Sequence, residues 1–236
     1  WAQKSFLLPD ILNPLVTEKD WLEEIIGILY KEKIDILIPG LDFEIPIFSK
    51  NKKIIEERTS STVIVSPKNV VDIGNDKWKT FQFLKEKGFY YPDSSLPKDL
   101  ENSELKNKYP LIIKPRFGNT SKDVFIVEDA EELAESVEKI DKPIIQEYIG
   151  SEESEFTCST TYVDKNIVSC ISLRRTLKNG NTNLAFLEDY TPIDLYIKKL
   201  TEALKPFGPT NFQLRLSSDH PTVFEINPRF SRFKFV

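Results

Sequence analysis

The sequence of 236 residues contains no methionine, one histidine, two cysteines and eight glycines. His220, Cys158 and Cys170 are too few to form a structural zinc site, which normally has four ligands, and the cysteines show no CxxC spacing. We therefore interpret both cysteines as small core residues rather than as a disulfide or a catalytic nucleophile. Because a natural chain normally begins with methionine, its absence predicts a fragment or a chain from which residues are omitted.

The sequence also lacks a basic excess and long apolar runs. Lys and Arg number 32 against 37 Asp and Glu, a net charge of −5, which excludes a general electrostatic binder of nucleic acid. Any anion site must therefore be local. No apolar run approaches the roughly 20 residues of a membrane-spanning helix, and the start at Trp1 lacks the layout of a signal peptide. With 40% hydrophobic and 29% charged residues, the composition is that of a globular protein, which we expect in the cytoplasm.

Helix and strand patterns alternate along residues 1–72. Thr17 is a helix N-cap followed by apolar residues at helical spacing, and a second helical segment covers 47–57. Short apolar strands over 34–38 and 63–65 follow the two helices. Buried strands that alternate with helices predict a parallel α/β unit. An independent parallel sheet usually has more strands, so this unit is expected to lack its beginning.

The remaining chain is predicted to be α+β, with a change of pattern near Gly150. Helix caps, breakers and strand periods define a small unit over 73–149 and an antiparallel unit over 150–236. The first contains a helix from Asp76 to Gly88, strands over 109–117, 124–127 and 143–150, and a helix capped by Asp129. The second contains a hairpin over 155–163 and 167–176, a helix capped by Thr191, and strands over 211–216 and 222–229.

Polar and apolar residues alternate along the last predicted strand. Because residues two apart share a face, Glu225, Asn227 and Arg229 are expected together on one side of it. The opposite side is expected to face the core with Phe224, Ile226 and Phe230. The strand therefore separates a chemical face from a packing face.

A turn of five residues sets the predicted register of this hairpin. Carboxylate, carboxamide and guanidinium groups then meet on one patch, since facing residues of paired strands lie side by side. Such oxygen donors suit Mg²⁺, which completes its shell with phosphate and water, and the guanidinium suits a phosphate. A solvated polar sheet face is the alternative. The turn is expected over 217–221, with the pairs Leu216 and Thr222, Gln213 and Glu225, and Asn211 and Asn227.

Two further groups suit a nucleotide. Lys114 leads from a strand into the loop Gly118-Asn119-Thr120-Ser121, whose hydroxyl and backbone N–H groups suit phosphate oxygens. The strand edge Gln146-Glu147-Tyr148-Ile149 is suited to present backbone groups to a purine, and Glu155 to accept ribose hydroxyls. Neither group is specific by itself, because the chain has no GxxxxGK[ST] or GxGxxG motif. An exposed hairpin, a solvated edge strand and a surface position for Lys77 are the alternatives.

The order of these groups along the chain is more specific than any one of them. It runs through Asp76-Lys77, Lys114-Pro115-Arg116, the strand edge 146–149 with Glu155, Gln213, and the segment Glu225-Ile226-Asn227-Pro228-Arg229-Phe230-Ser231. This order resembles that of the ATP-grasp superfamily, above all the carbamoyl-phosphate synthase large-chain module and the single-module carboxylate-amine ligases. The resemblance covers essentially the whole chain, and the segment 225–231 is its most specific part.

The resemblance implies an ATP-grasp fold behind an incomplete, Rossmann-like pre-ATP-grasp domain over 1–72. Residues 73–149 would be the small or lid subdomain and 150–236 the C-terminal subdomain with the metal site, both chain ends being incomplete. The implied metal ligands, for one or two Mg²⁺, are Gln213, Glu225 and Asn227, and the implied catalytic residues are Arg229, Arg174 and Arg175. The implied nucleotide-binding residues are Lys77, Lys114, Gly118, Asn119, Thr120, Ser121, Gln146, Glu147, Tyr148, Ile149 and Glu155.

The activity implied by the resemblance is ATP-dependent ligation. ATP would phosphorylate a carboxylate, and an amine or similar nucleophile would attack the acyl-phosphate, which needs metals and cations in line rather than a protein nucleophile. The implied cofactors are ATP and Mg²⁺, or Mn²⁺ in its place. Small carboxylates and amines are the implied partners, without nucleic acid or membrane, and a homodimer or a further subunit is left open.

Two alternatives to this activity stay open. One is a carbamoyl-phosphate synthase-type module that phosphorylates bicarbonate or carbamate. The other is a non-catalytic ATP-binding module. Thr120 and Asp123 stand where relatives often carry glycine, and a less flexible loop with an added carboxylate would close less well on ATP. This difference favours the binding module. Four intact residues favour catalysis, namely Gln213, Glu225, Asn227 and Arg229.

Overall fold

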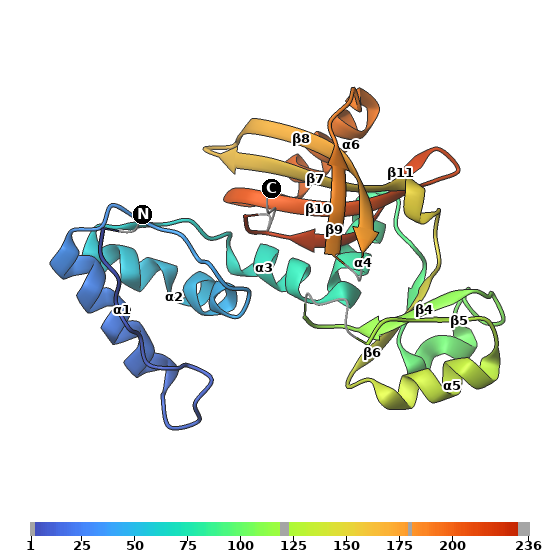
Figure 1. The fold of residues 1–236 in the computed structure, drawn as a ribbon, viewed down its shortest axis with the longest axis horizontal. Helices are drawn as coiled ribbons and strands as arrows, with labels where there is room; N and C mark the ends of the chain where they lie inside the picture. The colour runs from blue at the N-terminus through green and yellow to red at the C-terminus, as the bar shows by residue number, and fades with distance from the viewer. Residues whose placement is uncertain (1–2, 119–122, 179–180, 231–236) are drawn as a thin grey trace. The chain divides into compact units, whose positions relative to one another are not determined.

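The computed structural model describes residues 3–118, 123–178 and 181–230 (Figure 1). The chain separates into two compact units, residues 1–65 and 66–236. The predicted boundary after residue 72 therefore falls inside the second unit, within helix α3 (Lys68–Asn75), which no sequence pattern above predicts. No helix in the described ranges is long and apolar enough to cross a membrane.

The first unit combines two helices with a short parallel sheet. Thr17 caps α1, as predicted, by accepting the Asp20 N–H. The prediction of buried strands is wrong for β1, where Ile36 is 54% and the following Ile38 52% exposed. A parallel strand is buried only where helices cover both faces, and β2 is its one strand neighbour among the described residues. The elements are α1 (Glu18–Glu32), β1 (Ile36–Leu37), α2 (Glu44–Thr59) and β2 (Thr62–Val63).

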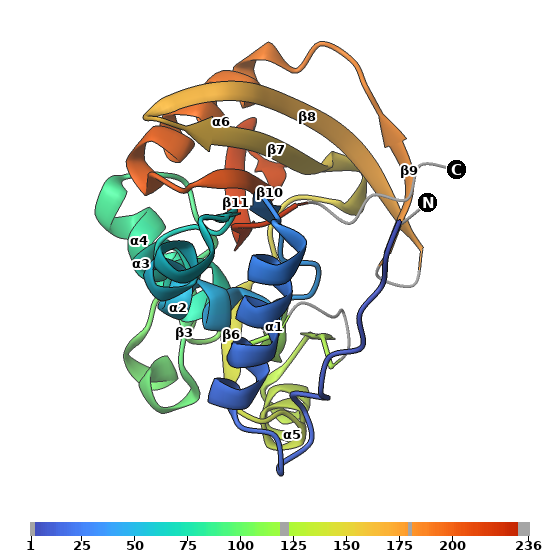
Figure 2. The same cartoon turned by 90° about the vertical axis from the view of Figure 1, so that its left-hand side faces the viewer.

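The second unit contains two antiparallel sheets in its described part. The larger has the strand order β11-β10-β7-β8-β9 and the smaller β3-β6-β4-β5. Figure 2 shows the long strands β7 and β8 side by side. The strands are β3 (Ser94–Ser95), β4 (Leu111–Pro115), β5 (Phe125–Val127), β6 (Pro143–Glu147), β7 (Glu155–Val163), β8 (Asn166–Lys178), β9 (Asn181–Phe186), β10 (Gly208–Ser217) and β11 (His220–Asn227). The α-helices after α3 are α4 (Lys77–Lys87), α5 (Ala130–Lys139) and α6 (Thr191–Leu204).

Local signals set the ends of these helices. Asp76 caps α4 and Gly88 ends it with a φ of 72°, a conformation that costs glycine little. Asp129 caps α5. Thr191, expected to cap α6, is instead its first residue, because its hydroxyl donates to Asp189 (2.6 Å) rather than accepting a helix N–H.

Helices cover one face of the larger sheet. Val70 of α3, Leu84 of α4 and Ile197 of α6 form one buried cluster with Phe212 of β10. The smaller sheet has a core of its own, in which Leu133 of α5 packs against β4 and β6. The helix that begins after Asp76 therefore packs with the larger sheet, although it precedes the smaller one in the chain.

The last hairpin has the predicted functional pairs but not the predicted turn. Ser218 and Asp219 form a two-residue turn, with φ values of 48° and 64°, in place of the turn over 217–221. A bulge on β11 leaves Phe224 without a partner and shifts the register by one residue. The shorter turn and the bulge compensate, so the pairs include Gln213 with Glu225 and Asn211 with Asn227.

The bulge also changes which side chains face the core. Ile226 is fully buried, as predicted, but the extra residue interrupts the alternation, and Val223 takes the next core position. Phe224 instead lies on the polar side, beside Lys114. Phe230 follows the end of the strand and is 49% exposed. The predictions that Phe224 and Phe230 face the core are therefore wrong.

Close packing of α3 on β11 gives a testable constraint. A Cβ at Gly74 would lie 2.5 Å from Pro228 Cδ and 2.7 Å from the Ile226 carbonyl oxygen. Gly74→Ala is expected to lower the free energy of unfolding by about 1–3 kcal/mol, because backbone must move to admit the methyl group. Denaturant unfolding measures this, with Gly27→Ala as a control because nothing lies within 4 Å of its Cβ position. Equal losses in the two variants would contradict the prediction.

Candidate functional site

A cavity of about 340 Å³ is lined by both sheets of the second unit. Strands β4 and β6 contribute one wall, and β7, β8, β10 and β11 contribute the other. The segments that were grouped only by their order in the sequence therefore meet at one place. The predicted residues that line it are Lys77, Lys114, Gly118, Gln146, Glu147, Tyr148, Ile149, Glu155, Arg175, Gln213, Glu225 and Arg229.

Arg174 and Arg175, both implied as catalytic residues, do not face the same cavity. Neighbouring residues of a strand point to opposite sides, and Arg175 is the one that lines the cavity. Arg174 lies over the Phe186 ring, 4.4 Å from its centroid, and 3.8 Å from the Glu188 carboxylate. It therefore belongs to the other side of the sheet.

Four other predicted site residues are not among the described residues that line the cavity. Asn227 is buried at 3% exposure, and it contacts Glu225 rather than lining the cavity. Asn119, Thr120 and Ser121 lie outside the described residues.

Lys114 is a buried cation on the β4 wall. Its Nζ donates to Gln146 Oε1 at 2.7 Å, and Gln146 Nε2 donates in turn to Ser94 Oγ at 2.9 Å. The ammonium also lies over the Phe224 ring, 5.5 Å from its centroid. Burial lowers the pKa of Lys114 to about 7, and the positive charge of Lys77 adds to this effect. The side chain is therefore poised to lose or take up a proton near neutral pH.

The start of α4 is tied to the segment that follows β4. Lys77 Nζ donates to the Gly118 carbonyl oxygen at 2.7 Å. The Arg116 guanidinium donates to both carboxylate oxygens of Asp76, at 3.1 and 2.6 Å. Burial lowers the pKa of Lys77, while Glu225 and Asp76 act in the opposite direction. These contacts hold Lys77 in the lining of the cavity, to which Glu225 also belongs.

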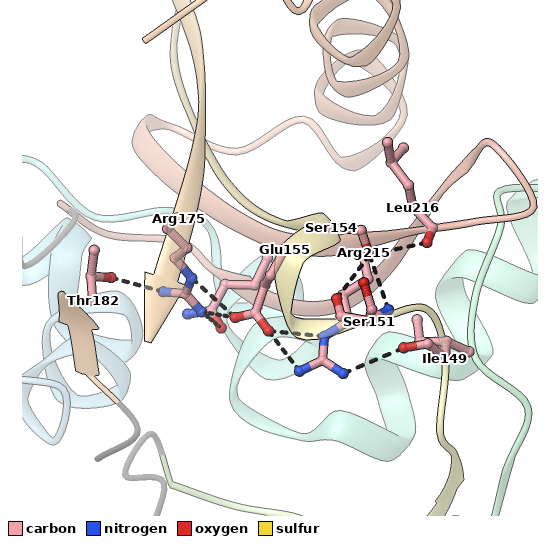
Figure 3. A network of polar contacts seen from close by, with 9 residues as sticks. Ile149, Ser151, Ser154, Glu155, Arg175, Thr182, Arg215 and Leu216 are labelled. Atoms are coloured by element: carbon pink, nitrogen blue, oxygen red, sulfur yellow. Dashed lines mark hydrogen bonds and ion pairs between the residues drawn. The ribbon is translucent and has the colours of Figure 1, made fainter. Parts of the chain in front are cut away.

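Glu155 is held between two arginines (Figure 3). Its Oε1 accepts from Nε and Nη2 of Arg175 at 3.0 and 2.6 Å. Its Oε2 accepts from Arg215 Nε at 2.9 Å and lies 2.8 Å from Arg215 Nη2. The Glu155 side chain is 3% exposed, so the carboxylate has no oxygen left to accept ribose hydroxyls. In this structure the two arginines occupy the carboxylate oxygens to which the ribose contact was assigned.

Arg215 is a cavity residue that the sequence analysis missed. Its guanidinium lies over the Tyr148 ring, 5.4 Å from the centroid, and donates to the Ile149 carbonyl oxygen at 3.4 Å. Arg215 stands two residues after Gln213, so strand alternation places both on one face. This two-residue alternation was the signal in the sequence that could have identified Arg215 as a cavity residue.

Two of the predicted metal ligands, Gln213 and Glu225, line the cavity, and the third, Asn227, contacts Glu225. Asn227 Nδ2 donates to Glu225 Oε1 at 2.9 Å, and Arg229 Nη2 lies 3.4 Å from Asn227 Oδ1. Gln213 Oε1 accepts from Arg175 Nη2 at 2.9 Å. In the described part of the chain, no three His, Cys, Asp or Glu residues cluster as a metal site. Glu225 lines the cavity and fits Mg²⁺, which takes one or two protein carboxylates and is completed by phosphate and water.

Comparison with known proteins explains this arrangement. A family model described as an ATP-grasp domain matches residues 74–232. The chain belongs to the ATP-grasp family. The family match covers both sheets and every described residue that lines the cavity. The predicted superfamily and the mixed α and β fold class are thereby confirmed.

Individual ATP-grasp relatives match parts of longer proteins. Carbamoyl-phosphate synthase of Methanobrevibacter smithii is 30% identical over 131 residues, which are 54% of this chain and 36% of that protein. The structure of an L-amino acid ligase from Bacillus licheniformis has a TM-score of 0.71 at 21% identity and covers 94% of this chain and 55% of its own.

A third relative was solved with its ligands bound. The biotin carboxylase domain of 2-oxoglutarate carboxylase from Hydrogenobacter thermophilus was solved with MgADP, ADP and bicarbonate. Its TM-score is 0.71 at 16% identity, over 92% of this chain and 53% of that one. At such identities the structural likeness concerns the fold alone, and the chain spans about half of either solved protein.

Proposed function

We propose that this ATP-grasp chain carries the nucleotide site of an ATP- and Mg²⁺-dependent ligase. In this ligase a carboxylate is phosphorylated to an acyl-phosphate, which an amine or similar nucleophile then attacks. The observation that carries the proposal is the convergence of Lys77, Lys114, Glu225 and Arg229 on one cavity from three separate segments, the last two residues coming from the end of β11 and the residues after it. Cations opposite a carboxylate are what transfer of a phosphoryl group requires, whereas no protein nucleophile is needed.

Each wall of the cavity has a distinct part in this proposal. Lys114 and Lys77 would hold phosphate oxygens, and the backbone from Glu147 to Ile149 would meet the adenine edge. Arg229 would stabilise charge on the transferred phosphoryl group. Glu225 would hold Mg²⁺, and the metal would supply neutralisation of phosphate charge. Mn²⁺ is expected to replace it, and association with a second copy or another subunit stays a prediction.

Two observations each favour an alternative function for this chain. Identity of 30% to a carbamoyl-phosphate synthase supports phosphorylation of bicarbonate or carbamate by the same cavity. Thr120 and Asp123, in and beside the phosphate loop, support a binding module without turnover. These candidates share the nucleotide site and differ in what accepts the phosphoryl group.

The deciding experiment is a screen of ADP release with the full-length protein over carboxylates, bicarbonate and amines. ADP release that requires both a carboxylate and an amine supports the ligase. Release with bicarbonate and ammonia supports the carbamoyl-phosphate synthase-type module. Tight MgATP binding without release with any acceptor supports the binding module. If no nucleotide binds, all three candidates are excluded.

The pKa of Lys114 predicts how nucleotide affinity depends on pH. Below about pH 7 the ammonium is already charged, so MgADP binding requires no proton at this group. Above that pH the unliganded lysine is neutral and binding must take up a proton, so affinity should fall by up to about tenfold per pH unit. Calorimetry in two buffers of different ionisation enthalpy should show proton uptake near pH 8.5. Lys114→Met should bind more weakly and lose this dependence, whereas an unchanged pH profile in Lys114→Met would contradict the assignment.

A further inference from the structure

Arg175 fixes the orientation of the Gln213 side chain. Arg175 Nη2 donates to Gln213 Oε1 at 2.9 Å. The arginine cannot swing away freely, because Glu155 accepts two of its N–H groups and Thr182 Oγ1 accepts a third at 3.2 Å (Figure 3). Its side chain is 11% exposed and that of Glu155 is 3% exposed. The guanidinium is thus a buried part of the cavity wall.

This contact decides which atom of the amide is available to a ligand. A guanidinium can only donate, so the amide oxygen of Gln213 must face Arg175, and a flipped amide would set donor against donor. The Gln213 NH₂ group, which cannot ligate a cation, is then the available end. A divalent cation on the same oxygen would also lie beside the positive charge of Arg175.

The amide oxygen of Asn227, a second predicted metal ligand, also faces a guanidinium group. Asn227 Oδ1 faces Arg229 Nη2 at 3.4 Å, and Asn227 Nδ2 donates to Glu225. Of the predicted donors, both amide oxygens are therefore directed toward guanidinium groups. The carboxylate of Glu225 is the donor that combines negative charge with a place on the cavity wall.

We propose that Arg175 turns Gln213 from a cation ligand into a hydrogen-bond donor for a phosphate oxygen, so that one divalent cation is held per nucleotide, through Glu225. This inference rests on the proposed nucleotide site. Arg175 acts as a positioning residue, because its donors are directed at Glu155, Thr182 and Gln213. The neutral NH₂ group of Gln213 then faces a charged phosphate, a contact of the stronger hydrogen-bond class.

Counting bound Mn²⁺ tests the proposal without turnover. The Mn²⁺ ion replaces Mg²⁺, the nucleotide is the non-hydrolysable β,γ-imido analogue of ATP, and loss of the free-ion signal in electron paramagnetic resonance gives the number bound. We expect one nucleotide-dependent Mn²⁺ in the wild type and still one in Gln213→Ala, which should bind the analogue about tenfold more weakly. Arg175→Met frees the Gln213 oxygen and should allow a second Mn²⁺ to bind.

The Mn²⁺ counts distinguish failure of this inference from failure of the proposed function. Two Mn²⁺ in the wild type with one lost in Gln213→Ala would overturn the inference while leaving the nucleotide site in place. If no Mn²⁺ binding depends on the nucleotide, the proposed function fails together with the inference. The wild-type and Gln213→Ala counts decide the matter even where Arg175→Met is too unstable to purify, and thermal unfolding shows whether each variant is folded.

Discussion

Glu155→Gln is expected to lower the free energy of unfolding of the second unit by about 3–5 kcal/mol, because it removes the negative partner of two buried arginines. The Arg175 and Arg215 side chains are 11% and 12% exposed, so water screens little of the charge that remains. Glutamine has nearly the same volume, so lost packing contributes little. In a unit of this size the loss corresponds to roughly 10 °C in the midpoint of thermal unfolding, measurable by calorimetry or circular dichroism.

Glu153→Gln provides the matched control. Glu153 lies two residues before Glu155 but is exposed and does not line the cavity, so the same change should alter stability by no more than about 0.5 kcal/mol. The two variants also test the role of Glu155 in ligand binding. An unchanged melting temperature in Glu155→Gln, together with lost discrimination between ATP and 2′-deoxy-ATP, would restore the ribose contact and contradict the buried network.

Glu225→Gln is expected to reduce ADP release by roughly 10²–10³-fold while leaving the fold intact. The substitution removes the charge that would hold Mg²⁺ against the phosphates. Asn227 Nδ2 donates to Glu225 Oε1 at 2.9 Å, and an amide oxygen at that place can accept the same hydrogen bond. The loss should therefore appear in turnover and in the Mg²⁺ dependence, with a melting temperature close to that of the wild type.

The control for this prediction lies in the same hairpin. Asp219 is exposed in the turn between β10 and β11, and its φ of 64° is one that asparagine tolerates. Asp219→Asn removes one carboxylate from the hairpin away from the cavity and should leave ADP release unchanged. Turnover by Glu225→Gln within a few fold of the wild type would mean that this carboxylate does not hold the catalytic cation.

Strand alternation and register predicted much of the site. Gln213 faces Glu225 although the turn was predicted too long, because the bulge at Phe224 adds the residue that the shorter turn removes. The pairing of Gln213 with Glu225 was therefore predicted correctly, but the alternation of polar and apolar residues does not predict the bulge on which it depends. The same alternation would have separated Arg174 from Arg175 and found Arg215, since it requires only the period of two.

By itself, the sequence determined most of the helices and strands, most helix caps and the face on which Gln213 and Glu225 lie, because periodicity and capping act over a few residues. Only the tertiary structure decided what the charged groups do. Glu155 reaches Arg175 and Arg215 across 20 and 60 residues of chain. Burial limits the screening of that ion pairing by water, and the same network turns the oxygen of Gln213 toward Arg175. Such choices depend on distances between strands, which spacing along one chain does not specify.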